Sequence, residues 1–455
     1  MASISRVLLF LILFFFGYYN SLIAQELLPP VQKWEGRSLE LMLAPDDEWA
    51  TPFEQSGGIS SPNYDTTITW IKKICRESSY LSLVQLGTSA QRRAIYMVLA
   101  TSEKSHHNQK IRESEKPTIL IQAGIHSGEI DGKDAGMMLL RNIAFKGKQR
   151  LLNNVNVLFI PILNVDGHEM RSQFSRVNQR GPEIMGWRTN SKNLNLNRDY
   201  TKIETEGIEG VMYAIKSYEP DLYLDIHVTD GVDYQHDIIY GFADHGAYST
   251  EITKWLKTYY RKEVDESLTR YDHIPGPLLF ARNGRDFSNG SVEFFFSPRF
   301  SNSYGDARHI PTVLIENHSL KPFRQRVLGT YVLIEQSILT LGNHNKELKS
   351  AIEKDCLDRP DSVIVKYIYE EESEEKIKIK AIESKIKTSK VTDQEVVEWT
   401  GKPKNMKIPV LRMTKEEKKV GLPKYYWIPV QYQALIEKIQ THGIKTESIY
   451  PETKK

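Results

Sequence analysis

Short apolar segments that suit buried strands alternate with amphipathic helical segments over residues 64–344. Val155–Ile162 and Leu222–Ile226 are short, nearly continuous apolar runs, the pattern of strands that are covered on both faces. The apolar residues of Asp131–Ala144 instead recur with helical spacing. This alternation predicts an α/β fold. Further strands are expected at Ala94–Ala100, Thr118–Ala123 and Val313–Ile315, and further helices at Thr66–Arg76 and Gln325–Leu341.

The composition fits a folded protein of this kind. The 455 residues are 40% hydrophobic and 26% charged, which is enough for a large buried core. The 60 basic and 58 acidic side chains leave a net charge of +2, so the bulk charge gives no support for nucleic-acid binding. The two cysteines, Cys75 and Cys356, fit neither a zinc cluster nor a redox motif, and the sequence leaves open whether they pair.

The N-terminus has the features of a secretory signal peptide. Arg6 precedes an apolar run, Val7–Phe16, and the small residue Ala24 stands before a polar residue. A membrane anchor is the alternative, but the polar residues in Tyr18–Ser21 interrupt the run. We therefore expect residues 1–24 to be a signal peptide, the mature protein to be secreted or periplasmic, and no stable membrane insertion after cleavage.

The last part of the chain differs in composition from the α/β region. Residues 346–390 are dense in Lys and Glu, yet apolar and polar residues alternate in Val363–Tyr367 and Ile377–Ala381 as they do in half-buried strands. Residues 346–455 are therefore expected to form a small α+β or β-rich accessory unit. Residues 25–345 would form the main domain.

Three possible metal ligands stand where predicted strands end. His126 and Glu129 follow the strand Thr118–Ala123, and His227 follows Leu222–Ile226. Open α/β sheets bind ligands at the carboxyl ends of their strands. Imidazole and carboxylate groups are good zinc ligands, and three of them leave the fourth position for water. Alone, the H-x-x-E pair would be weak evidence for a metal site. His227 alone would more simply be a histidine that forms a hydrogen bond at the end of a strand.

Two further segments bear charges that suit a hydrolytic site. Arg188, and then Asn197 with Arg198, lie between the two ligand segments, where guanidinium groups can pair with carboxylates. A solvated surface loop is the alternative. Glu316 closes the apolar strand Val313–Ile315, where a carboxylate is costly to bury unless it has a partner or a task. A general base beside a metal has such a task.

Taken in order, these residues resemble the zinc carboxypeptidase family of funnelin-type metallocarboxypeptidases. The family pattern is H-x-x-E, then W-R, then N-R, then a single His, and then a catalytic Glu that closes a late strand. The resemblance covers roughly residues 64–341. The matching residues here are His126 and Glu129, Trp187 and Arg188, Asn197 and Arg198, His227, and Glu316.

The resemblance implies a mixed, mostly parallel sheet of about eight strands flanked by helices, with one zinc ion at the strand ends. It implies that the metal ligands are His126, Glu129 and His227. One departure is Asn195, which stands where the family usually has an Asp that orients the first histidine.

The resemblance also assigns the substrate-handling residues. Glu316 would be the general base for a zinc-activated water, and Arg188 would stabilise the oxyanion. Asn197 and Arg198 would hold the terminal carboxylate. Tyr304 is the candidate for the tyrosine that covers the substrate.

The expected function is an exported, zinc-dependent metallopeptidase that removes C-terminal residues from peptides with a free C-terminus; the sequence leaves open whether these are ordinary or cell-wall peptides. One alternative is an N-acyl amino acid deacylase on the same fold. Another is a non-catalytic relative that binds peptide or glycan. Retention of a water-activating base disfavours the non-catalytic alternative. No residue indicates the side-chain preference.

Overall fold

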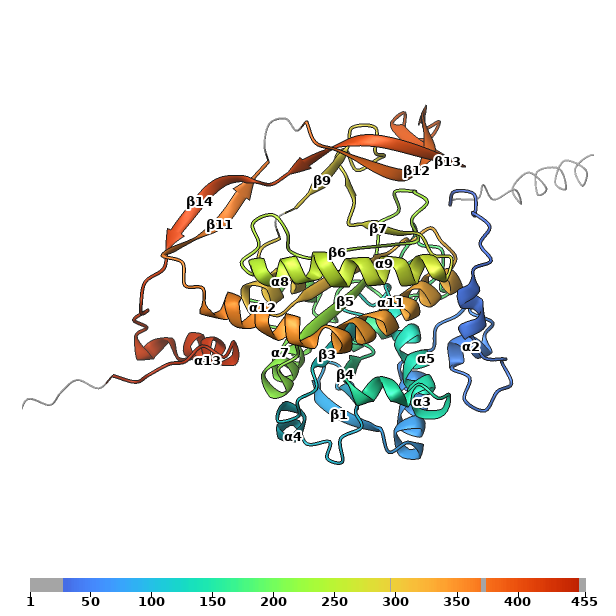
Figure 1. The fold of residues 1–455 in the computed structure, drawn as a ribbon. Helices are drawn as coiled ribbons and strands as arrows, with labels where there is room; N and C mark the ends of the chain where they lie inside the picture. Colours follow the sequence, from blue (N-terminus) through green and yellow to red (C-terminus); the bar gives the residue numbers. More distant parts are fainter. Residues whose placement is uncertain (1–27, 295, 370–373, 450–455) are drawn as a thin grey trace, which may run out of the picture.

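The computed structural model describes residues 28–294, 296–369 and 374–449 (Figure 1). The predicted signal peptide, residues 1–24, lies outside this range, so export remains a prediction. Within the described residues, none of the helices combines the length and the apolar character that crossing a membrane requires.

An eight-stranded mixed sheet forms the centre of the molecule. Parallel pairing joins β4, β3, β5 and β10 in the middle of the sheet, while β1, β2 and β6 are joined to their inner neighbours by antiparallel pairing. The predicted fold class is confirmed. In their order across the sheet, the strands are β1 (Leu81–Thr88), β2 (Ala94–Ala100), β4 (Asn156–Ile160), β3 (Thr118–Ala123), β5 (Leu222–Val228), β10 (Thr312–Asn317), β6 (Ile238–Gly241) and β7 (Pro275–Pro277).

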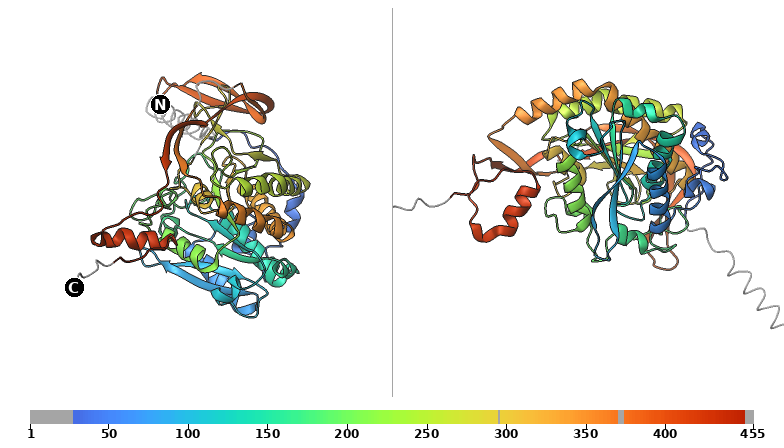
Figure 2. Two further views of the ribbon diagram at one scale, coloured as in Figure 1. Left: turned by 60° about the vertical axis from the view of Figure 1, so that its left-hand side comes forward. Right: turned by 90° about the horizontal axis from the view of Figure 1, so that it is seen from below.

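Helices cover both faces of this sheet (Figures 1 and 2). The first face is covered by α3 (Tyr64–Glu77), α5 (Asp131–Phe145), α8 (Thr250–Trp255), α9 (Arg261–Arg270), α11 (Phe323–Asn343) and α12 (Asn345–Leu357). The second face is covered by α4 (Asn108–Arg112), α7 (Glu206–Tyr218) and α10 (Ser301–Ala307). The remaining short helical segments are η1 (Arg37–Leu41), α2 (Pro52–Gln55), η2 (Gln149–Asn153), α6 (Val165–Glu169), η3 (Leu196–Arg198), η4 (Leu256–Tyr260), η5 (Val430–Tyr432) and α13 (Gln433–Thr441).

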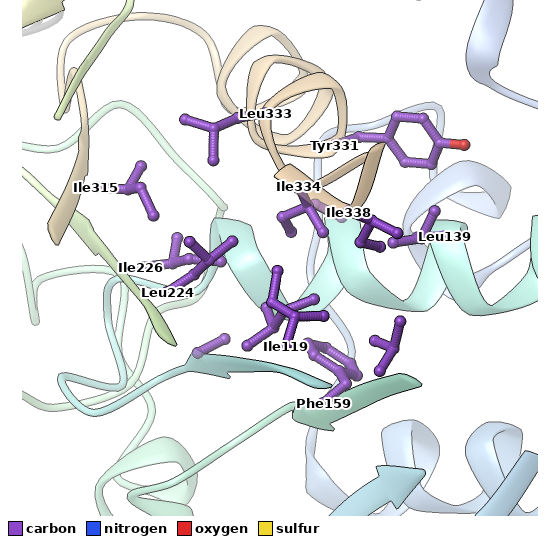
Figure 3. Packing of buried hydrophobic residues seen from close by; sticks show 14 of the residues in the cluster. Ile119, Leu139, Phe159, Leu224, Ile226, Ile315, Tyr331, Leu333, Ile334 and Ile338 are labelled. Carbon is purple, nitrogen blue, oxygen red and sulfur yellow. The ribbon is translucent and has the colours of Figure 1, made fainter. Parts of the chain in front are cut away.

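The larger hydrophobic core lies between the first face and its helices (Figure 3). Side chains of a strand point alternately to the two faces, so Leu224 and Ile226 of β5 pack into this core. Figure 3 shows them with Ile315 of β10 opposite residues of α11. Tyr223 of β5 faces the second core instead. The same alternation turns Asp225 of β5 toward the second face.

The C-terminal strands lie outside the main sheet, along one side of the molecule (Figures 1 and 2). The expected β-rich unit is therefore present, but its larger sheet is completed by two strands from the region before residue 345. Helix α13 lies beside α7 instead. The strands are β8 (Phe280–Ala281), β9 (Ser291–Glu293), β12 (Lys376–Thr388) and β13 (Glu395–Arg412) in a four-stranded sheet, and β11 (Ser362–Ile368) with β14 (Lys415–Gly421) in a ribbon.

Candidate metal centre

The turn between β3 and α5 carries the first two candidate ligands. Gly124 leaves β3 with a φ of +67°, a conformation that glycine adopts without strain. A Cβ atom there would also lie 3.1 Å from Ile130. The backbone N–H of Glu129 then donates to the carbonyl of His126 at 2.8 Å, and α5 begins two residues later. This tight turn brings the His126 and Glu129 side chains to the same point.

His227 of β5 completes a group of three donor atoms. His227 Nδ1 lies 3.2 Å from His126 Nδ1 and 3.0 Å from Glu129 Oε2, and His126 Nδ1 lies 3.3 Å from the same oxygen. Zinc–ligand distances of roughly 2.0–2.2 Å imply separations of about 3.3–3.6 Å between the ligands of a tetrahedron. The three side chains are buried and their spacing is close to this value. They fit one zinc ion.

The other ring nitrogen of each histidine is held by an acceptor. His126 Nε2 donates to Asn195 Oδ1 at 3.0 Å, and His227 Nε2 donates to Asp225 Oδ2 at 2.8 Å. A proton on Nε2 leaves the Nδ1 lone pair free for a metal, so these bonds set the tautomer that coordination needs. Asn195 therefore accepts the hydrogen bond from the first histidine that the family resemblance assigns to an Asp. Unlike an Asp, it carries no negative charge.

Glu129 is kept ionised by two arginines that contact its outer oxygen. Arg176 and Arg188 donate to Oε1 at 2.7 and 3.0 Å, and the backbone N–H of Val228 donates to Oε2 at 3.1 Å. Burial would raise the pKa of Glu129, but Arg176 and His126 outweigh it and hold that pKa well below its ordinary value. Oε2 can therefore act as an anionic ligand.

Glu316 lies beside His227 on the neighbouring strand. The two residues are partners in the parallel register of β5 and β10. Glu316 Oε2 is buried and has no hydrogen-bond partner among the described residues. Burial raises the pKa of Glu316 to about 8, while His227 opposes the rise and Glu129 adds to it. A carboxylate oxygen without a donor, next to three metal-ligating side chains, can accept a proton there.

The structure also brings Arg188, Asn197 and Arg198 to this edge of the sheet. The Arg188 side chain is 38% exposed and makes an ion pair with Glu129. Asn197 is buried, with Nδ2 3.4 Å from His227 Nε2, while its Oδ1 accepts from the backbone N–H of Ser301. Its described contacts support neighbouring side chains, so the substrate-binding role predicted for it remains a prediction.

Tyr304 has its partners elsewhere. It is 4% exposed on α10, and its hydroxyl lies 2.9 Å from His442 Nδ1 and accepts from Arg308 at 3.3 Å. None of its described contacts is to a metal-ligating side chain. The substrate-covering role remains a prediction, and the observed bonds instead tie α10 to the C-terminal segment.

The structure adds two residues that sequence reasoning missed. Arg176, whose side chain is 7% exposed, fixes Glu129 and also donates to the backbone carbonyl of Val228. Tyr234 stacks on His318 with ring centres 4.1 Å apart, and burial together with the charge of Glu316 raises the pKa of its hydroxyl. Both residues come from irregular segments without periodicity, so no sequence signal set them apart.

A second group of possible metal ligands lies away from this centre. Asp244, His245 and Glu293 have ligand atoms near one another, but His245 is exposed. Lys257 pairs with Asp244 and Arg412 pairs with Glu293. These cations already neutralise the two carboxylates, so this group fits a metal less well.

Comparison with known proteins agrees with this site. Residues 67–232 match the model of the zinc carboxypeptidase family, peptidase M14. The matched range contains all three metal-ligating residues and ends before Glu316. Over these residues the chain is similar to the zinc carboxypeptidase family.

Individual relatives are distant. The chain is 25% identical over 155 residues to carboxypeptidase Z of Gallus gallus, covering 32% of this chain and 22% of that one. It is 24% identical over 195 residues to carboxypeptidase Z of Mus musculus, covering 40% and 26%. The matches thus span about a quarter of the length of these relatives.

Similar solved structures include two bacterial enzymes. A metallo-carboxypeptidase from Burkholderia cenocepacia has a TM-score of 0.46 at 12% identity, covering 62% of this chain and 69% of that one. A metallo-carboxypeptidase from Pseudomonas aeruginosa, in complex with (2-guanidinoethylmercapto)succinic acid, has a TM-score of 0.44 at 18% identity, covering 62% and 68%.

Proposed function

We propose that this protein is a zinc-dependent carboxypeptidase that hydrolyses the last peptide bond of peptides with a free C-terminus. The observation that carries the proposal is the unpartnered oxygen of Glu316 beside the three converging ligands. A purely structural carboxylate would be expected to have donors for both oxygens. A carboxylate that must accept a proton during a reaction needs a free oxygen.

In the proposed hydrolysis, the metal acts as a Lewis acid and Glu316 transfers the proton. Zinc held by His126, Glu129 and His227 supplies Lewis-acid chemistry, which polarises a carbonyl and makes water more acidic. Glu316 Oε2 takes a proton from the attacking water as the new C–O bond forms. Glu316 then gives this proton to the leaving amine as the C–N bond breaks.

Arg188 is the residue that we assign to stabilising the negative charge that develops on the carbonyl oxygen. One of its nitrogens, Nη1, donates to Glu129, and the side chain is partly open to solvent. Guanidinium has further N–H donors beyond that bond. A donor fixed before the reaction stabilises an oxyanion without reorganisation.

Arg198 is the residue that we assign to the substrate's terminal carboxylate. Its guanidinium lies 3.9 Å from the ring centre of Phe300, and Nη1 donates to the carbonyl of Asn197 at 2.6 Å. In the part of the chain that the structure describes, Arg198 has no ion-pair partner. A half-buried cation without a partner is suited to bind a carboxylate bidentately.

The test compares a peptide that has a free C-terminus with the same peptide amidated. The native enzyme should cleave the free peptide much faster. Arg198→Ala should lower kcat/KM for the free peptide by about 100-fold, because the terminal carboxylate loses its partner. The amidated peptide should be little affected. Arg188→Ala is the matched control and should slow both peptides equally, since the oxyanion forms with either terminus.

Equal cleavage of the free and amidated peptides by the native protein would contradict the carboxypeptidase assignment but would still be consistent with a zinc amidase.

We also propose that the enzyme acts after export, because residues 1–24 have the pattern of a signal peptide. An exported fraction that retains its original N-terminus would contradict this.

A further inference from the structure

A second arginine, Arg299, is fixed next to the arginine assigned to the terminal carboxylate. Its Nε donates to the backbone carbonyl of Arg198 at 3.1 Å, and its own carbonyl accepts from the backbone N–H of Tyr200 at 3.3 Å. The next two residues continue the contact: Phe300 lies under the Arg198 guanidinium, and the N–H of Ser301 donates to Asn197. The segment 299–301 is therefore held against the segment 197–200.

Two of the three arginines gathered here, Arg198 and Arg299, have no carboxylate partner in the described part of the chain. Across the described residues, no carboxylate lies within ion-pair distance of Arg198 or Arg299. Arg188 shares its only described ion pair with Glu129. Burial lowers the pKa of Arg198, and the charges of Arg188 and Arg299 lower it further. Like charges held together at a half-buried site cost free energy, and a bound anion would remove that cost.

The bonds of Arg299 leave its outer nitrogens available. Only Nε is used in the contact with Arg198, and the side chain is exposed at the edge of the site. The two Nη atoms of a guanidinium form the fork that pairs with a carboxylate. One carboxylate of a substrate would occupy Arg198, so a second carboxylate on the same residue would be needed to occupy Arg299.

We propose that Arg299 binds a side-chain carboxylate of the substrate's C-terminal residue, so that the enzyme prefers peptides that end in an acidic residue. This inference rests on the proposed function, in which Arg198 holds the terminal carboxylate. A neutral C-terminal side chain leaves Arg299 without a partner. A C-terminal lysine places a third positive charge beside Arg198 and Arg299 and should be disfavoured.

The test uses three peptides that are identical except for a C-terminal Glu, Gln or Lys. The native enzyme should have a kcat/KM about tenfold higher for the Glu peptide than for the Gln peptide, and lowest for the Lys peptide. Arg299→Gln should remove the preference for Glu over Gln by slowing only the Glu peptide. Arg299→Lys, which keeps the charge but loses the fork, should retain part of the preference.

The matched control is Arg150→Gln. Arg150 is also exposed, but it lies in η2, directly before β4. It is therefore at the amino end of a strand, whereas the site lies at the carboxyl ends. Its substitution changes the net charge equally and should leave all three rates unchanged. Equal native rates on the Glu and Gln peptides would overturn the proposal. So would an Arg299→Gln variant that slows both peptides alike.

A binding measurement separates this inference from the proposed function. Calorimetry of the zinc-loaded protein should show tighter binding of N-acetylglutamate than of N-acetylglutamine, and Arg299→Gln should abolish the difference. If no peptide were cleaved but this difference were found, the carboxypeptidase function would fail and the acidic-ligand site would stand. If peptides were cleaved but the two ligands bound equally, the Arg299 proposal alone would fail.

Discussion

Glu54 and Glu316 both have oxygens shielded from solvent, but their hydrogen bonding differs. Both oxygens of Glu54 are occupied: Oε1 accepts from Leu43 and Arg141, and Oε2 accepts from Thr51 and Arg141. Glu316 has one buried oxygen with no described donor. The first carboxylate ties the N-terminal helix α2 to α5, whereas the second lies at the metal centre.

This difference is the one expected between a carboxylate that supports the fold and a carboxylate that takes part in a reaction. A buried ion pair with satisfied oxygens supports the fold, and removing either partner leaves an unpaired charge. Burying an oxygen that has no hydrogen-bond donor costs free energy of desolvation, and no hydrogen bond offsets this cost. Such costs are tolerated where the group takes part in a reaction. Substitutions at the two glutamates should therefore have opposite consequences.

The largest expected effect is on the rate of the Glu316→Gln variant. Glutamine has nearly the same shape but does not accept the proton from water, so kcat should fall by about 10²- to 10⁴-fold. Because Oε2 has no donor to lose, the free energy of unfolding should not fall. Steady-state kinetics and urea unfolding measure the two quantities. A near-native rate would show that the base lies elsewhere.

The second effect concerns stability. Glu54→Gln should lower the free energy of unfolding by roughly 3–5 kcal/mol, because Arg141 keeps its charge in a fully buried site. At a temperature where the variant is folded, zinc content and kcat should match the native values. A stability loss below about 1 kcal/mol would place this pair with weak surface pairs and remove the contrast with Glu316.

The smallest effect concerns the partners of the two histidine ligands. Asp225 gives His227 a charged acceptor, whereas Asn195 gives His126 a neutral one. Asp225→Asn should weaken zinc binding by about 10- to 100-fold, as is usual when such a partner is changed. Asn195→Asp should strengthen it by a smaller factor. Competition with a chelator measures both, and unchanged affinity in Asp225→Asn would contradict the account.

Much of the central sheet and the metal centre was predictable from the sequence. The predicted bounds of β2 and β3 agree with the structure, because buried strands are continuous apolar runs with polar residues at their ends. His126 and His227 come together because the parallel strands β3 and β5 are neighbours and end at the same edge. That neighbour relation follows from topology, so residues at strand ends are the most predictable part of the site.

The features of the site and the fold that the sequence did not predict depend on contacts between segments that are far apart along the chain. Arg176 reaches Glu129 from an irregular loop, so its position follows from the folded loop and not from a local pattern. Tyr304 is the candidate for the tyrosine that covers the substrate, but its hydroxyl contacts His442 in the C-terminal segment, which no local pattern predicts. Pairing of β13 with β9 joins the accessory strands to the main domain, and no local pattern specifies such long-range pairing.

The central claim is that His126, Glu129 and His227 hold one zinc ion, and metal analysis of purified variants tests it most directly. The native protein should contain one zinc per chain, and Glu316→Gln should contain the same amount, since we propose that Glu316 is the base and it is not among the three converging ligands. His227→Ala should lose the metal, because two remaining ligands do not hold zinc tightly. Full zinc occupancy in His227→Ala would contradict the assigned metal centre.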